Sequence, residues 1–342
     1  MRGSRAHGTA CRHGSGCTQM TASSSHLSGQ VHEAGFYSSD AEFRALIVPF
    51  AEEGIAAGQP VILGYDKRKS GLLRSWLGDP AGVTFINDTS LYATPARAIA
   101  AYRKLFARHA AAGAAQIRIA GDVPHEGNGG SFEGWDRYES AVNTVWHDFP
   151  VRSRCLYDIS TAAPQVLESA LRTHPCIVQP SGTRRRSDRY QDPAAFEALP
   201  PLPDPVEQSA PAVVLVEPST AQARHAVSAT GRGHVPDPRL QELVLGVSEA
   251  VANARRHGRP PVTLRIWTAA GCVVVHVHDT GPGPADPLAG LTPAAGAPSL
   301  PGAGLWLIHM LDLHPALIHS GDGFSLRLRA TASEMPAVAT AS

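Results

Sequence analysis

The sequence predicts an α/β protein of two domains, and three observations lead to this fold class. In the first half, apolar runs of strand character alternate with helical periodicity. That alternation is typical of a mostly parallel, doubly wound sheet with flanking helices. A proline-rich segment then separates the halves. In the second half, strand patterns joined by short turns indicate a mixed or antiparallel sheet, on which helices form a two-layer α/β sandwich.

The first domain is expected over residues 30–178. Its predicted strands are the runs PVILGY, VTFIN, AQIRIAG and SRCLYDI. Apolar residues at helical spacing lie around them, over residues 40–57, 95–112, 132–147 and 164–173. The sequence of this half contains no GxxxxGK[ST] pattern, so we do not expect it to hydrolyse a nucleotide.

Residues 179–209 are predicted to be a linker, because they are rich in proline and poor in branched aliphatic side chains. The run Arg184–Arg186 within them has acidic neighbours, which favours a solvated segment over a surface for an acidic partner. The second domain is expected over residues 210–331. Its predicted order is strand AVVLVE, helices over 219–230 and 238–256, strands VTLRIWT and CVVVHVHD, a glycine- and proline-rich loop, a helix over 305–313, and strands ALIHS and FSLRLRA.

Composition and charge exclude several classes of function. The formal net charge is zero, so we expect neither nucleic acid nor an anionic membrane as a direct partner. Every apolar run is far shorter than the roughly 20 residues of a membrane span. Residues 1–29 lack the apolar core of a secretory signal. We expect them and residues 332–342 to be disordered tails, with Met20 as an alternative start.

The cysteines favour a cytoplasmic protein. They are odd in number and scattered, which does not indicate a disulfide framework and fits a reducing compartment. Two of them, with two histidines, have spacing that permits a metal site, but their place in the predicted tail argues against one. These four residues are His7, Cys11, His13 and Cys17.

The predicted helix 238–256 carries a polar stripe. Asp237 is suited to cap this helix, and its apolar residues fall on one face. Glu249, Asn253 and His257 recur four residues apart and share a separate face, on which Gly246 also lies. At this point a solvated face is the better explanation of such a stripe, because exposed polar residues are the norm on a helix. Asn and Gly are unfavourable inside a helix, which raises the suspicion of a site.

Two glycine-containing loops follow the helix. Asp279 ends an apolar strand in the run HDTGPGP, where Gly281 and Gly283 free the backbone for close approach to a flat ring. In the run PGAGLWLI, Gly302 and Gly304 open a helix whose N–H groups can hold phosphate. The small and flexible segment ADPLAGLTPAAGAPSL between them is suited to a lid. Each loop alone is a weak signal, whereas the three elements in this order are specific.

With these motifs the second domain resembles the GHKL (Bergerat-fold) ATP-binding family. EAVANARRH resembles the N box of anti-sigma-factor serine kinases, DTGPG the G1 box and GAGLWLI the G2 box. The resemblance implies ATP and Mg²⁺ as cofactors, with Asn253 as the Mg²⁺ ligand, Asp279 on the adenine amino group and Glu249 orienting or deprotonating the attacking hydroxyl. The other residues that it places around the nucleotide are His257, Gly281, Gly283, Gly302, Gly304 and Leu305.

The resemblance implies a branch of this family as well. The sequence has no helical hairpin with a phosphoacceptor histidine before the ATP domain, which points to the anti-sigma-factor serine/threonine kinases. Such proteins bind a sigma factor and phosphorylate an anti-anti-sigma (STAS) protein, and dimers are implied. Two alternatives stay open. One is an ATP-binding module that acts only by partner sequestration, and the other is a histidine kinase with an unusual acceptor.

The first domain resembles the methanogen/methylotroph sensory (MEDS) domain, a Rossmann-like module. The resemblance rests on HEAGFY, PFAEEGIAAGQPVIL, LYATPARAIAAYR, YESAVN, CLYD and THP. It implies a sensor of a small molecule whose identity the sequence does not give. Several polar residues fall near predicted strand ends, where open α/β sheets bind ligands. The residues of this possible sensory pocket are His32, Tyr37, Tyr92, Glu139, Asn143, Cys155, Tyr157, Asp158 and His174.

Overall fold

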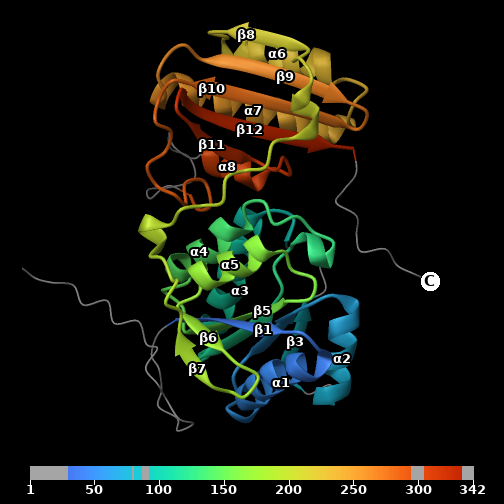
Figure 1. The fold of residues 1–342 in the computed structure, drawn as a ribbon, viewed down its shortest axis with the longest axis vertical. Coiled ribbons are helices and arrows are strands. Elements are labelled where there is room, and N and C mark those ends of the chain that lie inside the picture. Colours follow the sequence, from blue (N-terminus) through green and yellow to red (C-terminus); the bar gives the residue numbers. More distant parts are fainter. Residues whose placement is uncertain (1–29, 79–80, 87–91, 294–303, 333–342) are drawn as a thin grey trace, which may run out of the picture.

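The computed structural model describes residues 30–78, 81–86, 92–293 and 304–332. They form two α/β units stacked along the long axis of the molecule (Figure 1). The N-terminal unit contains a seven-stranded sheet and the C-terminal unit a five-stranded sheet. The predicted fold class is confirmed in both halves.

The N-terminal sheet is parallel except at one edge. β1 lies in the interior of the sheet between β5 and β6, and only the pairing of β6 with β7 is antiparallel. Because these strands are parallel, their carboxyl ends lie along the same side of the sheet, although the strands are far apart in the sequence. The strand order is β3 (Val83–Ile86), β2 (Val61–Gly64), β4 (Ile117–Gly121), β5 (Val151–Asp158), β1 (Val31–Tyr37), β6 (Cys176–Val178) and β7 (Arg184–Arg186).

Helices cover both faces of this sheet, as in a doubly wound fold (Figure 1). One face packs on α1 (Asp40–Ala56) and α2 (Lys67–Leu77), and the other on α3 (Pro95–Ala111), α4 (Trp135–Val145) and α5 (Pro164–Thr173). Because side chains alternate along a strand, neighbouring residues of β1 face opposite layers. His32 reaches Asn143 of α4, whereas Glu33 bonds Arg154, which itself donates to a carbonyl of α1.

The strands β1, β6 and β7 and the helix α2 were not among the predicted elements. β1 has the sequence VHEAGFY, in which buried polar residues obscure the apolar pattern of a central strand. The burial of Glu33 is compensated by ion pairs with Arg152, Arg154 and Arg184. α2 has the sequence KRKSGLLRSWL, where basic residues and a glycine interrupt the helical periodicity.

Two expectations about the end of this unit are corrected. The linker was predicted to begin at residue 179, but Arg184–Arg186 folds back as edge strand β7 on β6, where Arg184 Nε lies 2.8 Å from Glu33 Oε1. The buried carboxylate therefore recruits the basic run into the sheet. No disulfide was expected. Cys155 and Cys272 are free thiols, whereas Cys176 is disulfide-bonded.

The C-terminal sheet is antiparallel throughout, and helices lie against one of its faces to form a two-layer sandwich (Figure 1). Its strand order is β11 (Ala316–Ser320), β12 (Gly323–Thr331), β10 (Cys272–Asp279), β9 (Thr263–Ala269) and β8 (Val213–Val216). The helices are α6 (Thr220–Gly231), α7 (Asp237–His257) and α8 (Gly304–Met310).

Two details of α7 differ from the sequence-based expectation. Asp237 is its first helical residue rather than its cap, because Pro236 occupies the cap position without a side-chain hydrogen bond. Gly246 is buried, and a Cβ there would lie 2.7 Å from a methyl group of Leu313. The glycine thus permits close packing of the helix. It does not contribute to a polar face.

The search for membrane-spanning segments gave a negative result: no helix within the described residues is both long and apolar enough to cross a bilayer.

Candidate functional site

The polar stripe of α7 lies against the first residue of α8. A Cβ on Gly304 would lie 2.7 Å from Glu249 Oε2 and 3.2 Å from Asn253 Nδ2, so the approach requires a glycine. Glu249 and Asn253 are half-buried, and neither side chain has a hydrogen bond to another described residue. Their polar atoms are therefore available for a ligand at the start of α8.

Asp279 lies at the end of β10, next to the point where α7 ends. Its side chain is 4% exposed, and Oδ1 accepts hydrogen bonds from the backbone N–H groups of Gly281 at 2.8 Å and Arg259 at 3.1 Å. A Cβ on Gly258 would lie 2.3 Å from the carboxyl carbon of Asp279. Within the described residues Oδ2 has no donor, so it can accept a hydrogen bond from an amino group.

The other residues of the predicted nucleotide site lie at different places in the C-terminal unit. Gly283 has φ of 73°, and a Cβ there would lie 2.5 Å from the ring of Phe324. Leu305 is half-buried against the core of the unit. His257 is exposed at the last turn of α7. Gly302 lies outside the described residues.

These groups fit a nucleotide and a divalent cation. An amide oxygen beside a helix start suits a hard cation that prefers oxygen ligands, and a buried carboxylate at a glycine turn suits the amino group of a flat base. A surface hollow adjoins the Asp279 turn on the side of the β11–β12 turn, but neither Asn253 nor Glu249 lines it. The motif residues, rather than this hollow, mark the candidate nucleotide site.

In the N-terminal unit, four of the predicted pocket residues form one cluster on the α3–α5 face of the sheet. Their ligating atoms all lie within 4.8 Å of one another. Glu139 Oε2 is 3.1 Å from His32 Nε2 and 3.3 Å from His174 Nε2, and Cys155 Sγ is 3.6 Å from both His32 Nε2 and Glu139 Oε2. Burial disfavours the charge of Glu139, but the neighbouring histidines outweigh it and lower the pKa of this carboxyl to about 2. We call these four residues the His-Cys-Glu cluster.

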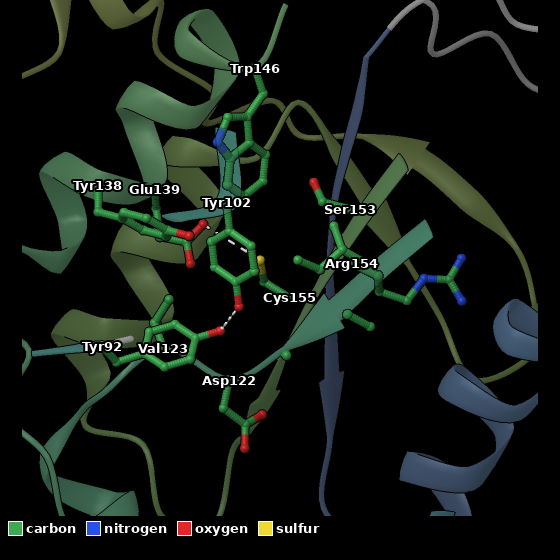
Figure 2. Close-up of a pocket in the computed structure, with 13 residues that line it drawn as sticks. Tyr92, Tyr102, Asp122, Val123, Tyr138, Glu139, Trp146, Ser153, Arg154 and Cys155 are labelled. Carbon is green, nitrogen blue, oxygen red and sulfur yellow. Dashed lines mark hydrogen bonds between the residues drawn. The ribbon is translucent and has the colours of Figure 1, made fainter. Parts of the chain in front are cut away.

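A small aromatic cavity adjoins this cluster. It has a volume of about 20 Å³, which is room for a water molecule or a ligand of similar size. Figure 2 shows Cys155 and Glu139 at its wall, beside the hydrogen-bonded hydroxyls of Tyr92 and Tyr102. Burial raises the pKa of the Cys155 thiol well above its usual range, and Glu139 acts in the same direction.

The structure places the other predicted pocket residues in different roles. Asn143 Oδ1 accepts a hydrogen bond from His32 Nδ1 at 3.0 Å, so Asn143 belongs to the surroundings of the cluster. The ring of Tyr157 meets His174 edge-on, with centroids 5.9 Å apart. Asp158 instead accepts hydrogen bonds from Ser160 in the turn after β5. Tyr37 lies outside the cluster.

Tyr37 packs beside a buried ion pair that the sequence analysis did not identify. Lys69 Nζ lies 5.6 Å from the centre of the Tyr37 ring and pairs with Asp122. Burial raises the pKa of Asp122 to about 6, although Lys69 acts in the opposite direction. The aromatic lining of the cavity was missed as well, because Tyr102, Tyr138 and Trp146 read as ordinary core residues of amphipathic helices.

Comparison with protein-family models decides what these two units are. Residues 31–175 match the MEthanogen/methylotroph, DcmR Sensory (MEDS) domain, and residues 215–329 match the histidine kinase-like ATPase domain. The chain joins a MEDS domain to a histidine kinase-like ATPase domain. Both resemblances are thus confirmed, and the ATPase class binds ATP with Mg²⁺. A search of the curated proteins found no match.

The MEDS domain contacts the loop between the G1 and G2 boxes of the ATPase domain. We call residues 285–293, the described part of this loop, the lid segment. Arg137 of α4 donates from Nε to the carbonyl of Pro287 at 2.9 Å and from Nη2 to that of Ala289 at 2.6 Å. Two leucines of the lid segment, Leu288 and Leu291, pack against the apolar core of the MEDS domain. The lid segment is therefore docked on the sensory domain.

A second contact joins α8 to the MEDS domain. The Thr94 hydroxyl donates to the carbonyl of His309 at 2.8 Å, and Arg97 Nε donates to that of Met310 at 2.6 Å. Arg137 Nη1 lies 3.3 Å from His309 Nε2. Burial and the adjacent Arg137 lower the pKa of His309 to about 3, so the ring is neutral and its Nε2 can accept this hydrogen bond.

Proposed function

We propose that the protein is a cytoplasmic regulator in which the MEDS domain senses a small molecule and controls an anti-sigma-factor kinase. In this proposal the ATPase domain binds ATP and Mg²⁺, phosphorylates a serine or threonine of an anti-anti-sigma (STAS) protein, and sequesters a sigma factor. The single observation that supports the control step is the docked lid segment, because the sensory domain contacts the loop that follows the Asp279 turn in the sequence.

The motif residues support the kinase chemistry. Asn253 would contribute the amide oxygen that ligates Mg²⁺, and Asp279 would hold the adenine amino group through Oδ2. Glu249 lies on the same face of α7, where it would orient or deprotonate the attacking hydroxyl of the partner protein. The bound Mg²⁺ would supply charge neutralisation for the triphosphate.

The segment before the ATPase domain favours the serine/threonine branch. A histidine kinase needs a helical hairpin with an acceptor histidine at this place. Between β7 and β8 the described chain instead contains only the short turns Pro193–Ala195 and Pro205–Gln208, in an otherwise extended segment. The acceptor hydroxyl is therefore expected on a separate protein.

The α4 helix offers a physical route from sensing to the lid. Glu139 faces the His-Cys-Glu cluster and the cavity, while Arg137, two residues earlier, faces the ATPase domain. A ligand that shifts α4 by a fraction of an ångström would alter the hydrogen bonds of Arg137 to the lid segment. The lid segment must leave the MEDS domain before it can close over a nucleotide, so docking is expected to hold the kinase back.

Phosphotransfer with the full chain tests the proposal. We expect labelled ATP with Mg²⁺ to transfer its γ-phosphate to serine or threonine of a STAS protein from the native cell extract. Asn253→Ala should abolish Mg²⁺-ATP binding with the fold intact, because the apolar face of α7 is unchanged. Glu249→Gln should retain ATP binding and reduce transfer by roughly 10²–10⁴-fold, the usual contribution of a general base.

A matched control is Gln241→Ala, an exposed polar residue of the same helix outside the stripe, which should behave as wild type. Normal Mg²⁺-ATP binding by Asn253→Ala would contradict the assigned site. ATP binding without transfer to any partner would leave sequestration alone as the output, and acid-labile phosphate on the chain itself would indicate a histidine kinase.

A further inference from the structure

Four side chains from distant parts of the MEDS domain converge on one buried point. His32 comes from β1, Glu139 from α4 and Cys155 from β5, and His174 follows α5. His32, Glu139 and His174 are each at most 2% exposed. Two imidazoles, a thiol and a carboxylate are the four groups that bind zinc in proteins.

The spacing of the four ligating atoms fits a tetrahedral metal. With metal–ligand bonds of about 2.0–2.3 Å, neighbouring ligands of a tetrahedron lie roughly 3.3–3.7 Å apart. The atoms of the His-Cys-Glu cluster are separated by 3.1 and 3.3 Å at the two histidine–carboxylate pairs and by 3.6 Å at the two sulfur pairs. A shift of a few tenths of an ångström would bring them around one ion.

The surroundings orient both imidazoles as metal ligands. Asn143 Nδ2 donates to three backbone carbonyls, which turns Asn143 Oδ1 toward His32 Nδ1 at 3.0 Å. His174 Nδ1 lies 2.9 Å from the carbonyl of Ala170. Each Nδ1 therefore donates a hydrogen bond, and Nε2 is the ring nitrogen that faces the cluster in both histidines.

The groups of the cluster match the charge of a divalent cation. Glu139 Oε2 is an acceptor, and it faces both Nε2 atoms. Zinc with two neutral histidines, a thiolate and a carboxylate balances all charges, since the two anions equal the charge of the ion.

We propose that His32, Glu139, Cys155 and His174 of the MEDS domain bind one zinc ion. The thiolate and the imidazoles favour zinc over Mg²⁺ or Ca²⁺, which prefer sites built of oxygen alone. On binding, the Cys155 thiol loses its proton to solvent and the Sγ–zinc bond forms, with no change of oxidation state. The proposed zinc site adjoins the wall of the aromatic cavity, because Glu139 and Cys155 belong to the cluster and also line the cavity.

Metal analysis of the purified full chain tests this site. We expect about one zinc per chain by inductively coupled plasma mass spectrometry, and replacement by Co²⁺ should produce thiolate-to-cobalt charge-transfer absorption. Cys155→Ser should lose the absorption band and most of the zinc. Asn143→Ala, which removes the support of His32, should lower zinc affinity about 10–100-fold.

Two controls make the result specific. Cys272→Ser removes the free thiol of the ATPase domain and should retain the zinc and the cobalt band. Cys11→Ser with Cys17→Ser removes the sulfur atoms of both cysteines near the N-terminus, and this variant should retain the zinc and the cobalt band as well. The proposal is overturned by a wild-type protein with far less than stoichiometric zinc, by zinc without a cobalt–thiolate band, or by loss of zinc in the Cys11 and Cys17 variant instead of Cys155→Ser.

Discussion

At the scale of single residues, glycines determine how closely the motifs of the ATPase domain approach one another. Gly258 and Gly304 each stand where a Cβ would collide with a polar side chain of the candidate site, Asp279 in one case and Glu249 in the other. Glycine is the residue that permits such an approach. These positions therefore couple packing to the placement of the functional groups.

Replacement of Gly258 tests this coupling. In Gly258→Ala the new methyl group would lie 2.3–2.5 Å from the Asp279 carboxyl atoms, so the carboxylate must move away from its two backbone donors. We expect the free energy of unfolding to fall by about 1–3 kcal/mol and ATP affinity to fall with it. Urea unfolding and ATP titration measure both.

The matched control is Gly321→Ala, since a Cβ at Gly321 meets no atom within 4 Å. This variant should leave stability and ATP affinity unchanged. Unaltered ATP affinity in a stably folded Gly258→Ala protein would show that the position of Asp279 does not govern nucleotide binding.

At the scale of elements, local sequence patterns predict individual helices and strands better than they predict which elements pair or pack together. The amphipathic spacing of α7 and the apolar run of β10 identify both elements correctly. The convergence of His32 with Cys155 depends instead on β1 pairing beside β5 across more than a hundred intervening residues. No periodicity within either strand encodes that neighbour, so the sequence yields the candidate residues and not the cluster.

The helix α4 shows the same limit and carries the next prediction. Arg137 occupies a helical position that reads as an ordinary basic surface residue, yet it is buried against the lid segment. Arg137→Met keeps the length of the side chain and removes both hydrogen bonds to the lid segment, together with the one to His309. We expect faster amide hydrogen exchange in the lid segment and tighter ATP binding, because the lid segment no longer has to break these contacts.

Arg103→Met is the comparison for this effect, because Arg103 also donates to a backbone carbonyl, that of Val145, but within the MEDS domain. It should leave exchange in the lid segment at the wild-type rate. Equal exchange in the Arg137→Met and wild-type proteins would exclude the contact as a restraint on the lid segment.

At the scale of the whole molecule, the contact between the two domains contains a titratable group. His309 is buried and neutral between α3, α4 and α8, with a pKa lowered to about 3 by burial and by Arg137. In the undocked or unfolded chain the ring is exposed and regains its ordinary pKa of about 6.5. Protons therefore bind the undocked state more tightly than the docked state.

The sign of this difference predicts how the contact responds to acid. The docked state has its full stability above pH 6.5, the ordinary pKa of histidine. That stability is lost progressively as the pH falls toward 3, the pKa of the buried His309. At pH 5 the loss amounts to about 2 kcal/mol. This pH lies about 1.5 units below the pKa of the exposed ring, and each unit costs roughly 1.4 kcal/mol while the buried ring stays unprotonated. Lowering the pH from 7.5 to 5 should therefore increase protease cleavage of the lid segment and expand the particle in small-angle X-ray scattering. Glutamine retains hydrogen-bonding groups but does not titrate, so His309→Gln should flatten this dependence. A wild-type profile in that variant would assign the acid response to another group whose pKa is lowered by burial, such as His276.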